Sequence, residues 1–267
     1  MNKIRKAVIP AAGYGTRFLP ITKIIPKELL PIGNKPAIQY VVEEAVEAGI
    51  EEIILVCNPH KIPIADFFRP DRTLNRFLEN QNKQKEIDEL KRIESLVRVT
   101  VVYQEEALGL GHSILCAKEA VEGESFLVML PDVLILPSHT GAKQLVDACQ
   151  NTWGVLLEKV PQEKLSSYGI VKCAINPQGD YVIHGAVEKP AIDEAPSNLS
   201  LLGRYVLPGD IFQYIGKKGS KGEVQLTDAL NAMAQKAPAL GILNSGKIFD
   251  VGTPEGLSEI YFHLKGH

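Results

Sequence analysis

The sequence predicts an α/β fold with a mixed, mostly parallel central sheet, and three observations favour it. Short apolar runs suited to buried strands alternate with helical patterns through the first half of the chain. A glycine-rich turn follows the first apolar run, and sheets of this kind bind their ligands at the carboxyl ends of strands. The second half carries strand patterns separated by turn signals, which predicts antiparallel additions to the sheet.

The first half divides into strands and helices by its residue patterns. Apolar runs predict strands at residues 6–10, 51–56, 97–103 and 126–130. A stripe of apolar residues predicts a helix over 37–48, which Gly49 ends, and a second helix is predicted over 111–120. Parallel strands joined by right-handed crossovers follow from this order.

The second half has closely spaced strands and ends in a helix. Strands are predicted at residues 153–160, 170–175, 181–187 and 201–207, and helices over 208–215 and 226–235. A short strand ending at Asp250 precedes a final helix over 254–264, whose opening Pro-Glu pair suits a helix start. Because no segment reads as a linker or a repeat, we expect one domain over residues 1–267.

Residues 71–96 form a highly charged segment that predicts a helical arm inserted after the second strand. Its apolar residues are Leu74, Phe77, Leu78, Ile87, Leu90 and Ile93. This stripe is thin for a helix that packs on a core. A solvated surface helix and a contact between subunits both remain open for the arm.

Composition excludes several classes of protein. A formal net charge of -3 gives no overall attraction to nucleic acid or to anionic membranes. No apolar run approaches the roughly 20 residues that a membrane span needs. The four cysteines stand far apart without a Cys-x-x-Cys pair, which argues against a zinc site or a disulfide framework. We therefore expect a cytoplasmic protein that binds neither nucleic acid nor membrane.

The loop that follows the first strand carries the strongest functional signal. Gly13 and Gly15 allow backbone N–H groups to approach a phosphate closely. The cations close behind them are Arg17, Lys23 and Lys27. Phe18 stands where a dinucleotide-binding fingerprint needs its third glycine, and the Gly-x-x-x-x-Gly-Lys-[Ser/Thr] pattern is absent. The loop thus predicts an anionic ligand, a nucleotide, held by neither of these two motifs.

Polar residues follow other predicted strands. Gln104 ends the third strand, and the glycines of the nearby 109–111 segment would let a planar base lie close to the backbone. Asp132 and Asp250 each follow a strand, and two carboxylates at the mouth of a sheet could hold Mg²⁺ together with water and substrate phosphates. The alternative for each aspartate is a turn or a helix cap.

A Glu-Lys pair ends a further strand at residues 188 and 189. Lys189 could bind a phosphate while Glu188 accepts hydrogen bonds from sugar hydroxyls; a solvated strand end is the alternative. His112 lies near the presumed cleft at the start of a helix, where we expect capping or packing. No Ser/His/Asp or Cys/His arrangement is apparent.

These motifs occur in one order along nearly the whole chain and together resemble the sugar-nucleotide pyrophosphorylases. The likeness is strongest to the bacterial UTP–glucose-1-phosphate uridylyltransferases. The matching segments are 11–32, 35–45, 109–112, 130–133, 168–169, 187–190, 203–205 and 224–228. One segment departs from that branch: residues 250–256 read Asp-Val-Gly-Thr-Pro-Glu-Gly, closer to the thymidylyl-, cytidylyl- and guanylyltransferase branches.

The resemblance implies a Rossmann-like three-layer nucleotidyltransferase fold and a reaction. It implies transfer of a uridylyl group from UTP to α-D-glucose 1-phosphate, with Mg²⁺ as cofactor and with UDP-glucose and pyrophosphate as products. One alternative is a related enzyme that uses dTTP, CTP or GTP with another sugar 1-phosphate. A more distant one is a non-catalytic nucleotide or sugar-phosphate sensor. We also expect a homo-oligomer, either a dimer or a tetramer.

The resemblance assigns roles residue by residue. Arg17, Lys27 and Lys189 would be catalytic, with Lys27 bridging the phosphates of both substrates. The nucleotide would contact Ala11, Ala12, Gly13, Gly15, Thr16, Glu28, Gln104 and Gly109, the last two reading the uracil. The sugar phosphate would contact Gly169, Glu188, Lys189 and Gly203. The metal would be held by Asp132 and Asp250.

Overall fold

A computed structural model describes residues 3–59, 61–216 and 222–266, which fold around a nine-stranded sheet. The strands lie in the order β5 (Arg98–Tyr103), β4 (Glu52–Cys57), β1 (Lys6–Ala11), β6 (Phe126–Met129), β11 (Leu199–Leu207), β8 (Gly154–Lys159), β12 (Ala239–Leu243), β10 (Tyr181–Glu188) and β9 (Gly169–Ile175).

The pairing confirms a mixed sheet built in two parts. β5, β4, β1 and β6 pair in parallel, as the alternation of strands and helices in the first half predicts. β11 then runs antiparallel to both β6 and β8, and β10 runs antiparallel to both β12 and β9. The β8–β12 pair is again parallel. The antiparallel additions therefore lie in the second half of the chain.

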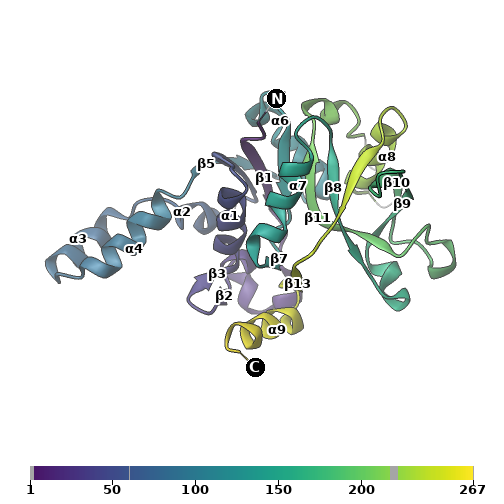
Figure 1. Cartoon of the computed structure of the whole chain (residues 1–267). Coiled ribbons are helices and arrows are strands. Elements are labelled where there is room, and N and C mark those ends of the chain that lie inside the picture. The colour runs from purple at the N-terminus through teal and green to yellow at the C-terminus, as the bar shows by residue number, and fades with distance from the viewer. Residues whose placement is uncertain (1–2, 60, 217–221, 267) are drawn as a thin grey trace.

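Helices cover both faces of the sheet and give three layers (Figure 1). Along β1, Ala7 and Ile9 pack into the core on one face and Val8 into the core on the other, which is the two-residue alternation of a strand buried on both sides. α1 (Ala37–Glu47) and α7 (Ala142–Ala148) contribute to the first core. α5 (Leu110–Cys116), α6 (Lys118–Val121) and α8 (Leu226–Ala234) contribute to the second.

Two small sheets lie beyond the end of β1, beside the last helix (Figure 1). β2 (Pro31–Ile32) pairs with β3 (Lys35–Pro36), and β7 (Val133–Leu136) pairs with β13 (Lys247–Asp250). α9 (Pro254–Leu264) begins at Thr253, whose hydroxyl accepts a hydrogen bond from Gly256 N. The β7–β13 pair brings two segments that are distant in the sequence to one edge of the main sheet.

Several elements differ from the predictions. The predicted helix over 111–120 is two short helices, α5 and α6, and residues 209–213 of the predicted helix over 208–215 form a 3₁₀ helix. β7, β12 and α7 were not predicted. In β12, Gly241 interrupts the apolar pattern because a Cβ there would lie 2.7 Å from Leu157 Cδ1 and 2.8 Å from Ile183 Cδ1.

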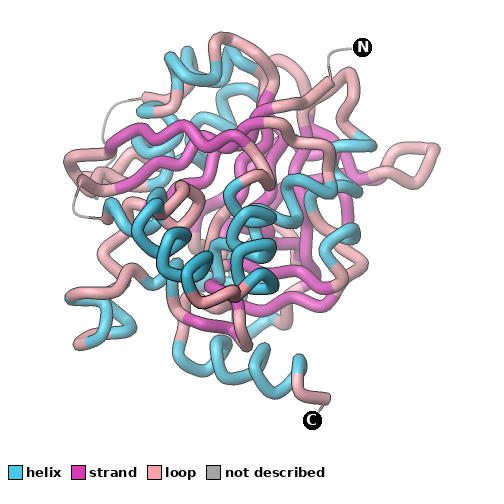
Figure 2. Tube along the Cα trace, turned by 90° about the vertical axis from the view of Figure 1, so that its left-hand side faces the viewer, coloured by secondary structure: helices cyan, strands magenta, loops and turns pink. Residues whose placement is uncertain are grey.

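The charged segment 71–96 contains a helical hairpin that projects from the body behind α2 (Ile62–Asp66) (Figures 1 and 2). Its helices are α3 (Arg72–Asn80), capped by the Asp71 carboxylate, and α4 (Gln84–Glu94). Leu78 and Ile87 are buried, whereas Phe77 is 56% exposed. The hairpin therefore has a small core of its own and leaves an aromatic side chain open to solvent.

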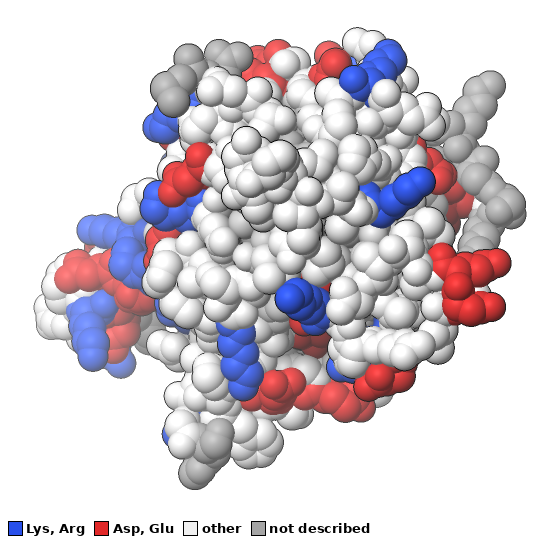
Figure 3. Space-filling model, turned by 45° about the vertical axis from the view of Figure 1, so that its right-hand side comes forward, with Lys and Arg blue, Asp and Glu red and all other residues white. Residues whose placement is uncertain are grey.

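Charge is dispersed over the surface that Figure 3 presents. Uncharged side chains cover much of this face, and basic and acidic side chains are interspersed around its rim and at a place near its centre. This face therefore shows no basic stripe of the kind that binds a nucleic-acid backbone. Among the described residues, no helix combines the length and the apolar character that crossing a membrane requires.

Candidate active site

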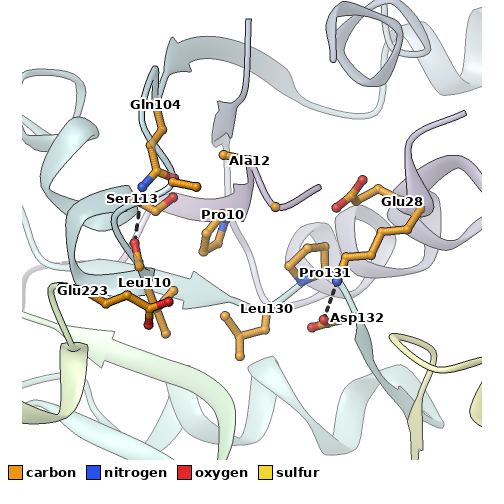
Figure 4. Close-up of a pocket in the computed structure, with 14 residues that line it drawn as sticks. Pro10, Ala12, Glu28, Gln104, Leu110, Ser113, Leu130, Pro131, Asp132 and Glu223 are labelled. Atoms are coloured by element: carbon orange, nitrogen blue, oxygen red, sulfur yellow. Dashed lines mark hydrogen bonds and ion pairs between the residues drawn. The ribbon is translucent and has the colours of Figure 1, made fainter. Parts of the chain in front are cut away.

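A cavity of about 350 Å³ opens at the carboxyl ends of β1, β5 and β6 (Figure 4). It is lined by Pro10, Ala12, Gly13, Lys27, Glu28, Gln104, Ala107, Gly109, Leu110, Ser113, Leu130, Pro131, Asp132 and Glu223. Many of these residues come from the loops that follow the three strands. The position agrees with the rule for ligand sites in open α/β sheets.

The glycine loop forms part of this wall, and its two glycines serve different purposes. Gly15 has a φ of +68°, which favours glycine, and its carbonyl accepts a hydrogen bond of 2.8 Å from Thr22 Oγ1. Gly13 has no neighbouring atom within 4 Å of where a Cβ would sit, so its backbone borders open space in the cavity. Gly15 thus shapes the loop, and Gly13 leaves room for a ligand.

Lys27 and Asp132 form an ion pair in the wall of the cavity. Lys27 Nζ lies 2.6 Å from Asp132 Oδ2, and both side chains are largely shielded from solvent. Burial on its own lowers the pKa of Lys27, but the opposing Asp132 carboxylate outweighs it and raises the pKa above its ordinary value. Lys27 is therefore held in its charged form beside the cavity.

Asp132 and Asp250 face one small space. Val251 N donates to the Asp132 carbonyl at 2.8 Å, which fixes the two loops together. A Cβ at Gly252 would lie 2.9 Å from Asp132 Oδ2 and 3.0 Å from Asp250 Oδ1, so only glycine leaves the space between the carboxylates open. Asp250 Oδ1 also accepts a hydrogen bond of 3.0 Å from Gly252 N, which is the turn contact predicted as the alternative to a metal site for this residue.

This pair of carboxylates fits a Mg²⁺ site that substrate completes. The donors are hard oxygens, and Mg²⁺ is usually bound through one or two carboxylates plus water and substrate phosphates. Across the described residues, no cluster of three or more His, Cys, Asp or Glu side chains is arranged to hold a metal. The geometry thus fits a cation held jointly by protein and phosphate and not one enclosed by protein alone.

A buried ion pair holds the Asp132 segment in place. Arg204, fully buried in β11, donates to the Leu130 carbonyl at 3.0 Å and the Val133 carbonyl at 2.7 Å, on either side of Asp132. Glu44 of α1 binds the same guanidinium at 2.7 and 3.0 Å. Sequence reasoning gave Arg204 no role, although a charge inside the apolar strand Leu-Leu-Gly-Arg-Tyr-Val-Leu was the available signal.

At the other end of the cavity, Gln104 is buried and its amide is fixed. Nε2 donates to the Gly109 carbonyl at 3.3 Å and lies 3.0 Å from His112 Nδ1. His112 thus contacts the Gln104 side chain, and the capping or packing role expected for it stays a prediction. A Cβ at Gly109 or Gly111 would lie 2.9 or 2.8 Å from the Val224 carbonyl, so the lack of a side chain at both positions admits that backbone. Gly109 also lines the cavity, and its contact with a base stays a prediction.

Glu28 and Lys61 form a second buried pair in this region. Lys61 Nζ lies 2.9 Å from Glu28 Oε2, while Glu28 Oε1 has no hydrogen-bond partner within the described part of the chain. Burial raises the pKa of Glu28, and the two neighbouring lysines, Lys61 and Lys27, offset only part of this effect. Sequence reasoning missed Lys61, which follows β4 in a position without a motif.

A second cavity of about 290 Å³ adjoins the first. The two share Leu110, Leu130 and Glu223 in their linings. The second is also lined by Ser167, Tyr168, Gly169, Glu188, Lys189, Leu201, Tyr205, Gln225, Leu226, Thr227 and Leu230. Sequence reasoning missed Glu223, which borders both cavities.

The Glu-Lys pair of β10 lies in this second cavity. Glu188 Oε2 accepts from Thr227 Oγ1 at 2.8 Å, and a Cβ at Gly169 would lie 3.2 Å from the same oxygen. Lys189 has a φ of +48°, which a non-glycine residue seldom adopts, and its N–H donates to the Tyr168 carbonyl at 3.0 Å. Such strained residues cluster at functional sites.

Electrostatics connect this cavity to the glycine loop and to the carboxylates. The pKa of Tyr168 is raised mainly by burial and then by the negative charge of Asp250, while the positive charge of Arg17 opposes the rise. Arg17 itself is exposed and forms no ion pair with any described residue. Arg17 lines neither cavity, but its charge acts on Tyr168, which lines the second one.

Several of the predicted residues line neither cavity; besides Arg17, Gly15 and Asp250, four more lie elsewhere. Gly203, with φ +74°, packs behind Leu130, since a Cβ there would lie 2.9 Å from Leu130 Cδ1. Thr16 and Lys23 line a separate pocket of the loop, and Ala11 is buried at the end of β1. The lining of the two cavities includes none of these four side chains.

Comparison with known proteins identifies the family. Residues 6–265 match the sequence model described as "Nucleotidyl transferase". The chain belongs to the nucleotidyl transferase family. A UTP–glucose-1-phosphate uridylyltransferase of Bacillus subtilis (strain 168) is 42% identical to it over 96% of this chain and 89% of its own length. One of Staphylococcus epidermidis is 41% identical over 96% of this chain and 90% of its own.

Solved structures agree with this nucleotidyl transferase assignment. A UTP-bound UGPase from Acinetobacter baumannii superposes with a TM-score of 0.90 at 40% identity, covering 98% of this chain and 93% of that one. A UDP-glucose pyrophosphorylase complexed with UDP-glucose gives 0.89 at 38% identity, covering 98% and 99%. The resemblance drawn from the motifs, and the fold that it implies, are confirmed.

Proposed function

We propose that this nucleotidyl transferase moves a uridylyl group from UTP to α-D-glucose 1-phosphate and releases pyrophosphate. The observation that carries the proposal is the pair of adjoining cavities, with Lys27 and Asp132 in the lining of the first and the Asp250 carboxylate facing the same small space as Asp132. A reaction between two phosphate compounds needs two neighbouring sites and positive charge between them. The names of the relatives support UTP and glucose 1-phosphate as the pair.

The first cavity is suited to the nucleotide. Glu28 and Asp132 lie on one side of Pro10 and Gln104 lies on the other (Figure 4). Gly13 and Lys27 also line this cavity and would supply an N–H donor and a cation to a triphosphate. Because the Gln104 amide nitrogen is already engaged by Gly109 and His112, its oxygen is the group left to accept from a base N–H.

The second cavity is suited to a sugar phosphate. Glu188, oriented by Thr227, offers carboxylate oxygens to sugar hydroxyls. Lys189 supplies a cation, with Nζ 3.9 Å from Glu188 Oε1 and more than half of its side chain exposed to solvent. That exposure leaves the ammonium group free to bind a phosphate.

The chemistry requires charge and positioning but no protein base. A phosphate oxygen of the sugar phosphate, already ionised at neutral pH, attacks the α-phosphorus in line. The new P–O bond forms as the bond to the bridging oxygen breaks, and the electron pair leaves with pyrophosphate. Lys27 and Arg17 stabilise the charge that develops on the leaving group, while Lys189 orients the attacking phosphate. No histidine among the described residues lines either cavity, which agrees with this scheme.

Mg²⁺ would be held by Asp132 and Asp250, as their shared space beside Gly252 allows. When bound, the ion supplies further positive charge to the substrate phosphates. The protein's own part is to hold both carboxylates in position through Arg204 and the Val251–Asp132 backbone contact.

We further propose that the protein is cytoplasmic and forms a homo-oligomer, either a dimer or a tetramer.

The related alternative is another nucleotide with another sugar 1-phosphate, which the 250–256 segment favours. A non-catalytic sensor is disfavoured because Arg17, Lys27, Asp132, Lys189 and Asp250 are all present. Rates of pyrophosphate release from UTP, dTTP, CTP and GTP, each with glucose 1-phosphate and with other sugar 1-phosphates, test the proposal. A clear preference for UTP with glucose 1-phosphate is expected, and a preference for any other pair would replace it.

A further inference from the structure

Ser113 places a buried hydroxyl without a partner in the nucleotide cavity. It lies in α5 and is only 3% exposed. Its backbone N–H donates to the Gly109 carbonyl at 3.1 Å, but Oγ has no hydrogen-bond partner among the residues that the structure describes. Buried hydroxyls are nearly always paired, because leaving one unpaired sacrifices its hydrogen bonds to water.

The position of this hydroxyl distinguishes it from the other unpaired groups. Buried side-chain atoms without a partner in the described residues are Glu28 Oε1, Asn75 Oδ1, Ser113 Oγ and Ser200 Oγ. Of these four, only Glu28 and Ser113 line the nucleotide cavity. Ser200 lies within β11 and lines neither cavity. A ligand in the cavity can therefore reach Ser113 but not Ser200.

Ser113 lies at the end of the cavity where the base would bind. Figure 4 shows it beside Gln104, on the side of Pro10 opposite Glu28 and Asp132. Gln104 presents an acceptor there, since its amide nitrogen is engaged. A serine hydroxyl adds a donor next to that acceptor. Uracil carries an N–H flanked by two carbonyl oxygens, so one acceptor and one donor side by side match its edge.

We propose that Ser113 Oγ donates a hydrogen bond to a carbonyl oxygen of the uracil ring and is a specificity-determining residue for the nucleotide. This inference rests on the proposed function and deepens it. The nucleotide would supply the hydrogen-bond partner that Ser113 Oγ lacks among the described residues.

The first test compares Ser113→Ala with Ser200→Ala by calorimetric titration with UTP and by thermal unfolding without ligand. Ser113→Ala should bind UTP about three- to tenfold more weakly, the equivalent of one neutral hydrogen bond. Its unliganded Tm should equal or exceed that of the wild type, because the variant removes an unpaired polar atom. Ser200→Ala should share that Tm behaviour and bind UTP like the wild type. Ser113→Cys, with similar volume and a weak donor, repeats the test should Ser113→Ala unfold.

The second test uses UTP analogues in which one carbonyl oxygen is replaced by sulfur, a weaker acceptor. Either 2-thio-UTP or 4-thio-UTP should bind the wild type more weakly than UTP does, and Ser113→Ala should lose that difference. Equal penalties in both proteins for both analogues, or equal UTP affinity of the two alanine variants, would overturn the inference. Failure of the wild type to make UDP-glucose would instead overturn the proposed function, so the two failures are distinguishable.

Discussion

Lys27 Nζ lies 2.6 Å from Asp132 Oδ2, the same oxygen that borders the space beside Gly252. In the proposed reaction Asp132 and Asp250 would hold Mg²⁺, and Lys27 would pair with a phosphate of the nucleotide as well as with Asp132. Lys27 and the metal would thus both depend on the Asp132 carboxylate.

Replacing Lys27 with alanine should cut kcat by about 10²–10³, as loss of one charge-stabilising group does in such sites. Circular dichroism and the oligomeric state should not change. Lys23→Ala is the matched control, because Lys23 is in the same loop but lines a different pocket. Pyrophosphate release measures both variants, and wild-type turnover by Lys27→Ala would exclude Lys27 from the chemistry.

Removal of the metal should abolish the reaction. EDTA is expected to stop pyrophosphate release and added Mg²⁺ to restore it, while Asp132→Asn and Asp250→Asn should each raise the Mg²⁺ concentration needed for half-maximal rate. Titration of Mg²⁺ against initial rate checks this. Full activity in chelator would show that the reaction needs no metal, which would leave Asp250 its turn contact and Asp132 its ion pair with Lys27.

Gly252→Ala tests the shared space directly. A Cβ there would lie within 3.0 Å of both Asp132 Oδ2 and Asp250 Oδ1, so the carboxylates must move apart. The expected result is a raised Mg²⁺ requirement in a protein that still binds glucose 1-phosphate. An unchanged Mg²⁺ titration would mean that the space is not used.

The Arg204–Glu44 pair should separate stability from activity. Removal of either partner leaves a buried charge unpaired and should cost about 3–5 kcal/mol in free energy of unfolding. The double variant Glu44→Met/Arg204→Met should recover much of this loss. Its activity should stay low, because the Leu130 and Val133 carbonyls beside Asp132 have lost their donor. Denaturant titrations measure the stability, and Mg²⁺-dependent rates measure the activity. If the double variant recovered both its stability and its activity, the Arg204–Glu44 pair would have only a structural role.

The free energy of unfolding should depend on pH through the Lys27–Asp132 ion pair. The pKa of Lys27 is raised in the folded protein. The ion pair therefore contributes its full stabilisation to the folded state at pH values below the ordinary lysine pKa of 10.5, and this contribution is lost as the pH rises through the raised pKa. In Asp132→Asn the burial of Lys27 remains without its carboxylate, so its pKa should fall. Unfolding free energies of the two proteins between pH 8 and 11 check this, and parallel curves would contradict it.

Much of the site could be predicted because its residues follow apolar strands. Asp132 and Gln104 follow strands with clear apolar patterns. Because parallel strands have their carboxyl ends on the same side of the sheet, the two residues were expected to lie in one site. The pairing of Arg204 with Glu44 could not be predicted, although the charge within an apolar strand marked Arg204, since the pair joins residues that are distant in the sequence. The packing of Gly109 and Gly111 against Val224 could not be predicted, because Val224 lies far along the chain.

The same limit explains the missed elements. Residues 239–243 are a strand because β8 and β10 flank them, and Gly241 is required by the side chains of Leu157 and Ile183. The residue pattern of the segment gave no sign of these partners. Similarly, the β7–β13 pair that brings Asp250 to Asp132 joins segments that are distant in the sequence.

The most direct test of the account is a competition in one vessel. The purified protein receives glucose 1-phosphate, Mg²⁺ and equal concentrations of UTP, dTTP, CTP and GTP, and the sugar nucleotides formed are separated by chromatography. UDP-glucose should be the main product, and Lys27→Ala should form almost none. A main product that carries another base, or no sugar nucleotide at all, would contradict the proposed function.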